Sequence, residues 1–199
     1  MIVRAATLFH HVAALAVTAL ALSMNAQAVS EKVLYDFQDR TNSSLWQIVN
    51  DGVMGGVSTS QFQILTNGGA VFSGLVSLEY NGGFASVRSL PAHHDLTGCD
   101  SFLLRVRGDG RRYKFSVRTE AGLDTPPYQL AFTTKRREWE EHRLPFKDFV
   151  PTFRGRLLTD VPLLNPAKVS SVGFLISDKQ EGPFKLEVAW IKASAREGK

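Results

Sequence analysis

The segments Ser101-Phe-Leu-Leu-Arg-Val-Arg107, Gly108-Asp-Gly110 and Tyr113-Lys-Phe-Ser-Val-Arg118 give the clearest indication of the fold class of this 199-residue chain. In both halves, large apolar residues recur at every second position, so their side chains share one face of an extended segment. This alternation predicts two half-buried β-strands. The glycine-rich turn between them predicts that the strands pair as a hairpin.

The same alternation recurs outward from this stretch, in short segments separated by clusters of Gly, Pro, Asn and Asp. The segments are 33–37, 61–65, 70–73, 84–88, 128–133, 138–144, 172–177 and 184–193. About ten short strands with turn signals and no sustained helical period predict an all-β sandwich or jelly roll. The apolar phase of the strands predicts a core that contains Phe102, Leu104, Val106, Phe115, Val117, Leu130, Phe132, Phe174, Leu186 and Val188.

One long connection, 145–166, lacks a clear strand pattern and could hold a brief helix or an irregular excursion. Its aromatic residues Phe146, Phe149 and Phe153 indicate that it packs against the domain. Cys99 is the only cysteine, so no disulfide can form within the chain. Cys99 precedes an apolar run and is interpreted as a small buried residue.

The first 28 residues have the pattern of a cleaved signal peptide. Arg4 is their only basic residue, 12–22 is an apolar run too short to span a bilayer, and Ala28 ends a small-x-small motif. A mitochondrial transit peptide is the alternative, but it usually carries several Arg residues. We therefore expect residues 29–199 to form one periplasmic or secreted domain. Its 22 basic and 19 acidic side chains, once Arg4 is removed, call for neither nucleic acid nor a polybasic membrane anchor.

The segment Asp51-Gly-Val-Met-Gly-Gly-Val-Ser58 combines a carboxylate, three glycines and an apolar Val/Met pair. It lacks the Lys-Ser/Thr ending of a phosphate loop and leads into a strand rather than a helix, which argues against a nucleotide site. Two interpretations stay open. Asp51 caps backbone N–H groups in a wide turn, or the loop forms part of a ligand or partner surface.

Catalytic patterns are weak. No Gly-x-Ser-x-Gly motif occurs, and residues 29–199 contain only three histidines, of which the adjacent His93 and His94 point apart on an extended chain. A pair of carboxylates for glycoside hydrolysis has candidates but no spacing that pairs them. We therefore expect no catalytic residue, no metal site and no cofactor.

Strand alternation places aromatic and basic side chains on an outer face. If Ala85 and Val87 point inward, Phe84 and Arg88 point outward. Trp46 and Trp139 could extend this surface for sugar stacking or partner docking, although core packing is the commoner fate of an aromatic residue in a sandwich.

Several motifs resemble those of the complex I intermediate-associated protein family, over residues 35–193. They are Trp46 with Asn50-Asp-Gly-Val-Met-Gly-Gly-Val-Ser58, Phe72-Ser-Gly74, Asn81-Gly-Gly-Phe-Ala-Ser-Val-Arg88, Gly108-Asp-Gly-Arg-Arg-Tyr113, Tyr128, Trp139, Leu144-Pro-Phe146, Phe153-Arg-Gly-Arg156, Gly173-Phe174 and Asp178-Lys-Gln180. The resemblance implies a galactose-binding-like jelly roll, related in fold to carbohydrate-binding modules. It also implies a non-catalytic role in holding assembly intermediates of respiratory NADH:ubiquinone oxidoreductase.

Taken with this resemblance, the patterns predict a monomeric binding protein, and the resemblance implies that it holds a protein client or assembly intermediate, such as a subunit of a membrane complex. The predicted contact surface comprises Asp51, Met54, Phe84, Arg88, Asp178 and Lys179. Loops of a sandwich gather at its ends, so Asp51 and the Asp178–Lys179 pair are expected on one rim. The alternative is a carbohydrate-binding module, and an undetected hydrolase or transferase comes third.

Overall fold

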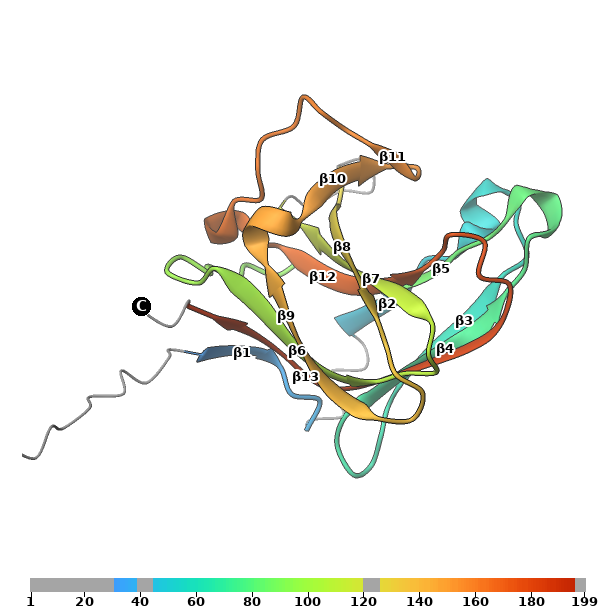
Figure 1. Ribbon diagram of the computed structural model, residues 1–199, viewed down its shortest axis with the longest axis horizontal. Coiled ribbons are helices and arrows are strands. Elements are labelled where there is room, and N and C mark those ends of the chain that lie inside the picture. Colours follow the sequence, from blue (N-terminus) through green and yellow to red (C-terminus); the bar gives the residue numbers. More distant parts are fainter. Residues whose placement is uncertain (1–30, 39–44, 120–125, 196–199) are drawn as a thin grey trace, which may run out of the picture.

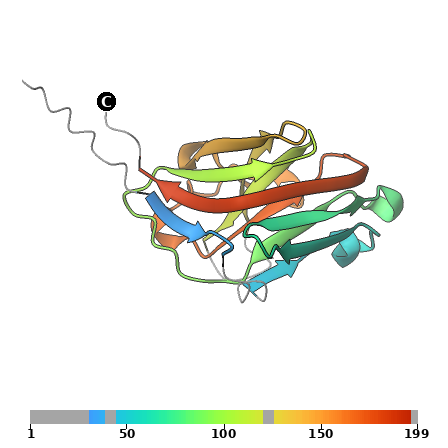
Figure 2. The same cartoon turned by 90° about the horizontal axis from the view of Figure 1, so that it is seen from below.

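The chain folds as two antiparallel β-sheets packed face to face, which confirms the predicted all-β sandwich (Figures 1 and 2). The structure is a computed structural model that describes residues 31–38, 45–119 and 126–195. These residues form thirteen strands and four short 3-10 helices. The signal peptide expected at residues 1–28 lies outside the described residues.

One sheet is organised around the long strand β13 (Gly182–Ser194). The first half of β13 pairs with β4 (Ala70–Val76) and its second half with β1 (Glu31–Tyr35), both on one edge. Its other edge pairs with β6 (Ser101–Arg107). The outer strands are β3 (Thr59–Ile64) beside β4 and β9 (Trp139–Pro145) beside β6.

The other sheet has seven strands, with β12 (Ser171–Ile176) between β7 (Arg112–Arg118) and β5 (Ala85–Ser89). Three short strands that the sequence patterns did not predict complete it. They are β2 (Trp46–Ile48) beside β5, β10 (Val150–Phe153) beside β8 (Tyr128–Thr133), and β11 (Arg156–Leu157) beside β10. β8 also pairs with β7.

The predicted hairpin of 101–107 with 113–118 is wrong, although both segments are strands. β6 pairs with β13 and β9 in the first sheet, and β7 pairs with β12 and β8 in the second. The loop between them therefore crosses from one sheet to the other. Alternation every two residues shows which face of a strand is buried, and this pattern is the same for a paired hairpin and for strands that face each other across a core.

The core lies between the sheets, where the predicted inward faces meet. Nine of the ten predicted core residues are buried, and Leu130 is partly buried. Phe102 of β6 and Phe115 of β7 join the two layers, with ring centroids 5.1 Å apart in an edge-to-face arrangement. Aromatic pairs of this geometry add stability beyond the area they bury.

The connection 145–166 is packed, as predicted. Phe146, in the 3-10 helix η4 (Phe146–Asp148), and Phe149 are buried against the core, while Phe153 in β10 is half-buried. Cys99 is only partly buried, yet it packs against the core, and burial raises the pKa of its thiol. These properties fit a packing role for the thiol rather than a reactive one.

Candidate partner-binding surface

Two glycine-rich loops meet at one end of the sandwich (Figures 1 and 2). The first contains the 3-10 helix η2 (Asp51–Met54) and leads into β3. The second contains η3 (Glu79–Asn81) and connects β4 to β5. β3 pairs with β4, and β2, which precedes η2, pairs with β5, so strand pairing brings the two loops side by side.

Asp51 joins the two loops through its buried carboxylate. Its Oδ1 accepts a hydrogen bond from the Ser58 N–H at 2.9 Å, and its Oδ2 accepts bonds from the N–H groups of Gly83 at 2.7 Å and Phe84 at 3.3 Å. The Ser58 hydroxyl donates a further bond to Oδ2. The side chain is 0% exposed, so Asp51 shapes the surface from beneath and does not itself contact solvent.

The charge of Asp51 is stabilised by these contacts. Burial alone would raise the pKa of the carboxyl, but the hydrogen bonds from Ser58, Gly83 and Phe84 outweigh burial and lower the pKa below its ordinary value. A carboxylate that accepts several backbone N–H bonds is favoured in its ionised form. Asp51 is therefore a structural anion at neutral pH.

Two glycines make room for this carboxylate. A Cβ at Gly56 would lie 2.4 Å from the Asp51 Cγ, and a Cβ at Gly82 would lie 2.7 Å from Oδ2. Any side chain at either position would displace the carboxylate. The glycine density read from the sequence thus serves close packing around Asp51.

Ser58 extends the connection to the base of the second loop. Its hydroxyl accepts a hydrogen bond from the Ser77 N–H at 3.0 Å. In the second loop, Tyr80 and Asn81 adopt positive φ angles of 53° and 59°, which residues other than glycine seldom adopt. Such backbone conformations persist only where surrounding contacts hold them.

The joined loops and the adjoining end of β4 expose large apolar side chains, which we call the apolar rim. Six of the thirteen exposed large apolar residues in the described part of the chain belong to it: Val53, Met54, Val57, Leu75, Leu78 and Tyr80. Val53 and Tyr80 are each 71% exposed and Met54 is 51% exposed. Single exposed apolar side chains are ordinary, but a concentration on one pair of loops is typical of an interaction surface.

The loop that follows β12 lies at the same end of the molecule. Ile176, the last residue of β12, pairs with Ala85, and Phe84 precedes Ala85, so Asp178 and Lys179 emerge close to the second loop. The Asp178 carboxylate pairs with the Lys114 ammonium at 2.7 Å. Burial opposes ionisation of Asp178, but the Lys114 contact outweighs it and lowers the pKa. Lys179 is exposed.

Of the predicted surface residues, Arg88 lies away from the others. Like the half-buried Phe84 it faces outward, but it lies four residues further along, about 13 Å at the rise of a strand. Arg88 donates to the Gln47 Oε1 at 3.5 Å, on the outer face of the seven-stranded sheet. Met54, Phe84, Asp178 and Lys179 thus gather at the end held by Asp51, and Arg88 does not.

The three candidate aromatic platforms have different environments. Trp46 is 9% exposed and packs in the core, with its ring centroid 4.7 Å from that of Phe62. Phe84 is half-buried, and Trp139 is 41% exposed with the Arg107 guanidinium 4.9 Å from its ring centroid. They therefore do not form one surface.

Residues 35–188 match the family described as Complex I intermediate-associated protein 30 (CIA30). The chain belongs to this family. Its CIA30 relatives include "Complex I intermediate-associated protein 30, mitochondrial" of Mus musculus, 28% identical over 180 residues that cover 80% of this chain and 55% of the relative. The protein of the same name in Drosophila melanogaster is 24% identical over 181 residues, covering 80% of this chain and 61% of the relative. The chain thus spans little more than half the length of these relatives.

Solved structures show the same jelly-roll β-sandwich fold. The family 11 carbohydrate-binding module of Lic26A-Cel5E from Clostridium thermocellum aligns with a TM-score of 0.66 and 17% identity, covering 85% of this chain and 96% of the module. An agarase aligns with a TM-score of 0.59 and 10% identity, covering 85% of this chain and 25% of the enzyme. At these identities the likeness shows the fold alone.

Two further properties of the described residues bear on the site. No group of three or more His, Cys, Asp or Glu side chains there could hold a metal ion. Within the same residues, no helix is long and apolar enough to cross a membrane.

Sequence reasoning selected Met54 but missed the other members of the apolar rim. Val53 and Val57 lie in the quoted 51–58 segment, and Leu75, Leu78 and Tyr80 lead into the Asn81-Gly-Gly motif. A signal was available, because large apolar residues in a glycine-rich turn have no strand face to occupy. Only the contacts of Asp51 and Ser58 show that the two segments form one surface.

Proposed function

We propose that this chain is a non-catalytic binding protein that holds a protein client, an assembly intermediate of complex I, through the apolar rim. The observation that carries the proposal is the concentration of exposed apolar side chains on two loops that a buried carboxylate holds in place. Exposed apolar area is costly in water and is typical of surfaces that bind another protein. The choice of a complex I intermediate as the client rests on the names of the CIA30 relatives.

The proposal gives the predicted residues distinct roles. Met54 and Tyr80 contact the client, with Phe84, Asp178 and Lys179 at the margin of the contact. Asp51 is a positioning residue that holds the two loops against each other. Its replacement should disturb both stability and binding, since its carboxylate is inaccessible to a client.

A crosslinking experiment tests the client. A photoreactive amino acid replaces Tyr80 in the chain expressed in its own cells, and the crosslinked partners are identified by mass spectrometry. We expect subunits of complex I among them, and we expect complex I subassemblies to accumulate on native gels when the chain is deleted.

Matched variants connect this result to the rim. Val53→Ser combined with Tyr80→Ser should abolish the complex I crosslinks. When expressed in the deletion cells, this variant should also fail to restore the assembly of complex I. Leu157→Ser combined with Leu163→Ser removes two other apolar side chains, 60% and 75% exposed, and should behave as wild type. Normal assembly with the rim variant, and no complex I subunit at position 80, would refute the proposal.

We further propose that residues 1–28 direct export and are removed, so that the domain acts in the periplasm or outside the cell. The relatives are named mitochondrial, which favours the alternative that residues 1–28 are a mitochondrial transit peptide. Sequencing the amino terminus of the mature protein decides between them. A terminus at Val29 in an exported fraction supports the proposal, and retention of the first 28 residues contradicts it.

Carbohydrate is the alternative ligand, favoured by the exposed Trp139 on the outer side of β9. Sugar recognition relies on exposed aromatic faces, and Trp46 is unavailable because it lies in the core. Calorimetry with oligosaccharides tests this alternative. Binding that Trp139→Ala abolishes in a folded protein would make the chain a carbohydrate-binding module.

A further inference from the structure

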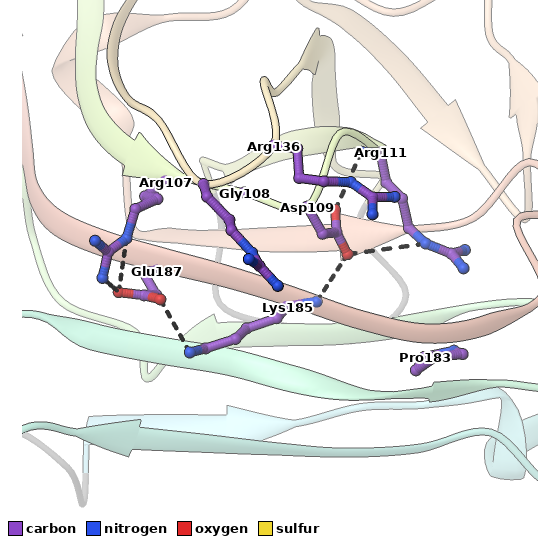
Figure 3. A pocket seen from close by; sticks show the side chains of 9 residues that line it. Arg107, Gly108, Asp109, Arg111, Arg136, Pro183, Lys185 and Glu187 are labelled. Carbon is purple, nitrogen blue, oxygen red and sulfur yellow. Dashed lines mark hydrogen bonds and ion pairs between the residues drawn. The ribbon is translucent and has the colours of Figure 1, made fainter.

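A polar pocket of about 620 Å³ opens on the outer face of the six-stranded sheet, next to the apolar rim (Figure 3). Pro183, which lines the pocket, pairs with Leu75 of the rim across β13 and β4. The pocket floor is β13, from which Lys185 and Glu187 point outward. Its volume lies in the range typical of small-molecule sites.

The pocket carries an excess of positive charge. Its lining has two acidic side chains, Asp109 and Glu187, and five basic ones: Arg107, Arg111, Arg136, Arg137 and Lys185. The acidic groups are already engaged. Glu187 pairs with Arg107 and, at 2.9 Å, with Lys185. Asp109 accepts the Lys185 backbone N–H at 2.9 Å and lies 3.8 Å from the Arg111 Nε.

Arg136 and Arg137 are the unsatisfied members of this cluster. Among the described residues, neither guanidinium has a hydrogen-bond or ion-pair partner, and both residues are exposed. Figure 3 shows the Arg136 side chain at the pocket, beside that of Asp109. Two guanidinium groups are therefore free to bind a ligand.

The backbone that carries these arginines is fixed in place. The Arg137 N–H donates to the Gly108 carbonyl at 2.9 Å, and the Thr134 hydroxyl accepts from the Gly110 N–H at 3.2 Å. A Cβ at Gly108 would lie 2.1 Å from the Thr134 Oγ1, so only glycine lets the two loops approach this closely. The backbone of the site is therefore already ordered before a ligand binds.

We propose that this pocket binds the dianionic phosphate group of a phosphate monoester, with Arg136 and Arg137 as its principal ligands. A phosphate monoester carries nearly two negative charges at neutral pH and three acceptor oxygens. Two guanidinium groups match this charge and present forked N–H donors that suit phosphate. A single carboxylate would neutralise only one of them. Arg111 and Lys185, which also line the pocket, add positive potential.

The phosphate group could belong to a soluble ester or to a phospholipid headgroup, and two probes separate these sources. Calorimetry with glucose 6-phosphate tests the soluble ester, and sedimentation with vesicles of phosphatidic acid in phosphatidylcholine tests the headgroup. We expect binding of at least one probe that weakens steeply with added salt, because the charges are exposed. Binding of either probe supports the site. The probe that binds shows whether the phosphate group comes from a soluble ester or from a phospholipid headgroup.

Charge-removing variants assign the binding to the pocket. Arg136→Gln with Arg137→Gln should weaken binding by about tenfold or more, since each loses a charge-assisted hydrogen bond. The matched control, Arg154→Gln with Arg156→Gln, removes two exposed arginines near β11 and should bind as wild type. The rim variant Val53→Ser with Tyr80→Ser should also retain phosphate binding, which separates this site from the client surface.

Three results would overturn the proposal. They are no binding of either probe by the folded wild-type protein, equal binding by the Arg136/Arg137 variant and wild type, and tighter binding of the dicarboxylate succinate than of glucose 6-phosphate. Denaturant melts of each variant confirm that it is folded before binding is measured.

Discussion

Replacing Asp51 by Ala should destabilise the protein strongly, although the residue lies in a surface loop. The substitution leaves the N–H groups of Ser58, Gly83 and Phe84 without their acceptor, in a site where the carboxylate is 0% exposed. Each unpaired buried donor costs about 1–3 kcal/mol. Water can enter the space left by the carboxylate, so we expect a total loss of about 3–5 kcal/mol and a fall in Tm of roughly 10 °C.

The pH dependence of stability gives a second measure of the same contacts. The folded-state pKa of Asp51 lies below its unfolded value, so ionisation of the carboxyl stabilises the folded protein. This contribution is fully present above the unfolded pKa, near pH 4, and is lost as the pH falls through the folded pKa. Asp51→Asn has no such ionisation. The difference in unfolding free energy between wild type and Asp51→Asn should therefore be constant from pH 7 to pH 5 and shrink below about pH 4.

Urea denaturation of wild type, Asp51→Ala and Asp51→Asn at several pH values between 7 and 3 measures both effects. A loss below about 1 kcal/mol for Asp51→Ala at pH 7 would refute the reasoning, because it would mean that the loop donors find other partners. A wild-type to Asn difference that does not change with pH would show that the charge of Asp51 contributes nothing.

Three further predictions follow from the packing. Gly56→Ala should cost about 1–3 kcal/mol in denaturant melts because its Cβ collides with the Asp51 carboxyl, whereas Gly52→Ala, which has no neighbour within 4 Å, should stay within about 0.5 kcal/mol of wild type; equal losses would contradict this account. Phe115→Ala should lose about 3–5 kcal/mol, since it removes a ring at the centre of the core, and a loss below 1 kcal/mol would show that the core contact is misplaced. Tyr80→Ser, at a side chain 71% exposed, should leave the melting temperature nearly unchanged while weakening client crosslinks, and a large drop in stability would assign Tyr80 a structural role.

Local patterns in the sequence were enough to predict the fold class and most of the core. Alternation with a period of two identified strands and their inward faces, so residues such as Phe102, Phe115 and Leu186 are buried as predicted. The motifs also indicated the CIA30 family, which the match over residues 35–188 shows. These inferences succeeded because the buried face of a strand is visible locally, as apolar residues at every second position of the chain.

The pairing of the strands and the contacts between loops could be seen only in the folded protein. Adjacent strands β6 and β7 lie in different sheets, and the loop that joins them helps to form the basic pocket. The Asp51 carboxylate accepts a hydrogen bond from Gly83, which lies 32 positions further along the sequence. Asp51 was predicted as a contact residue, but it is buried and holds the loops beneath the apolar rim. A local pattern states which face of a strand avoids water but carries no information about the partner strand. That choice is made by long-range packing and by the pairing of every buried polar group.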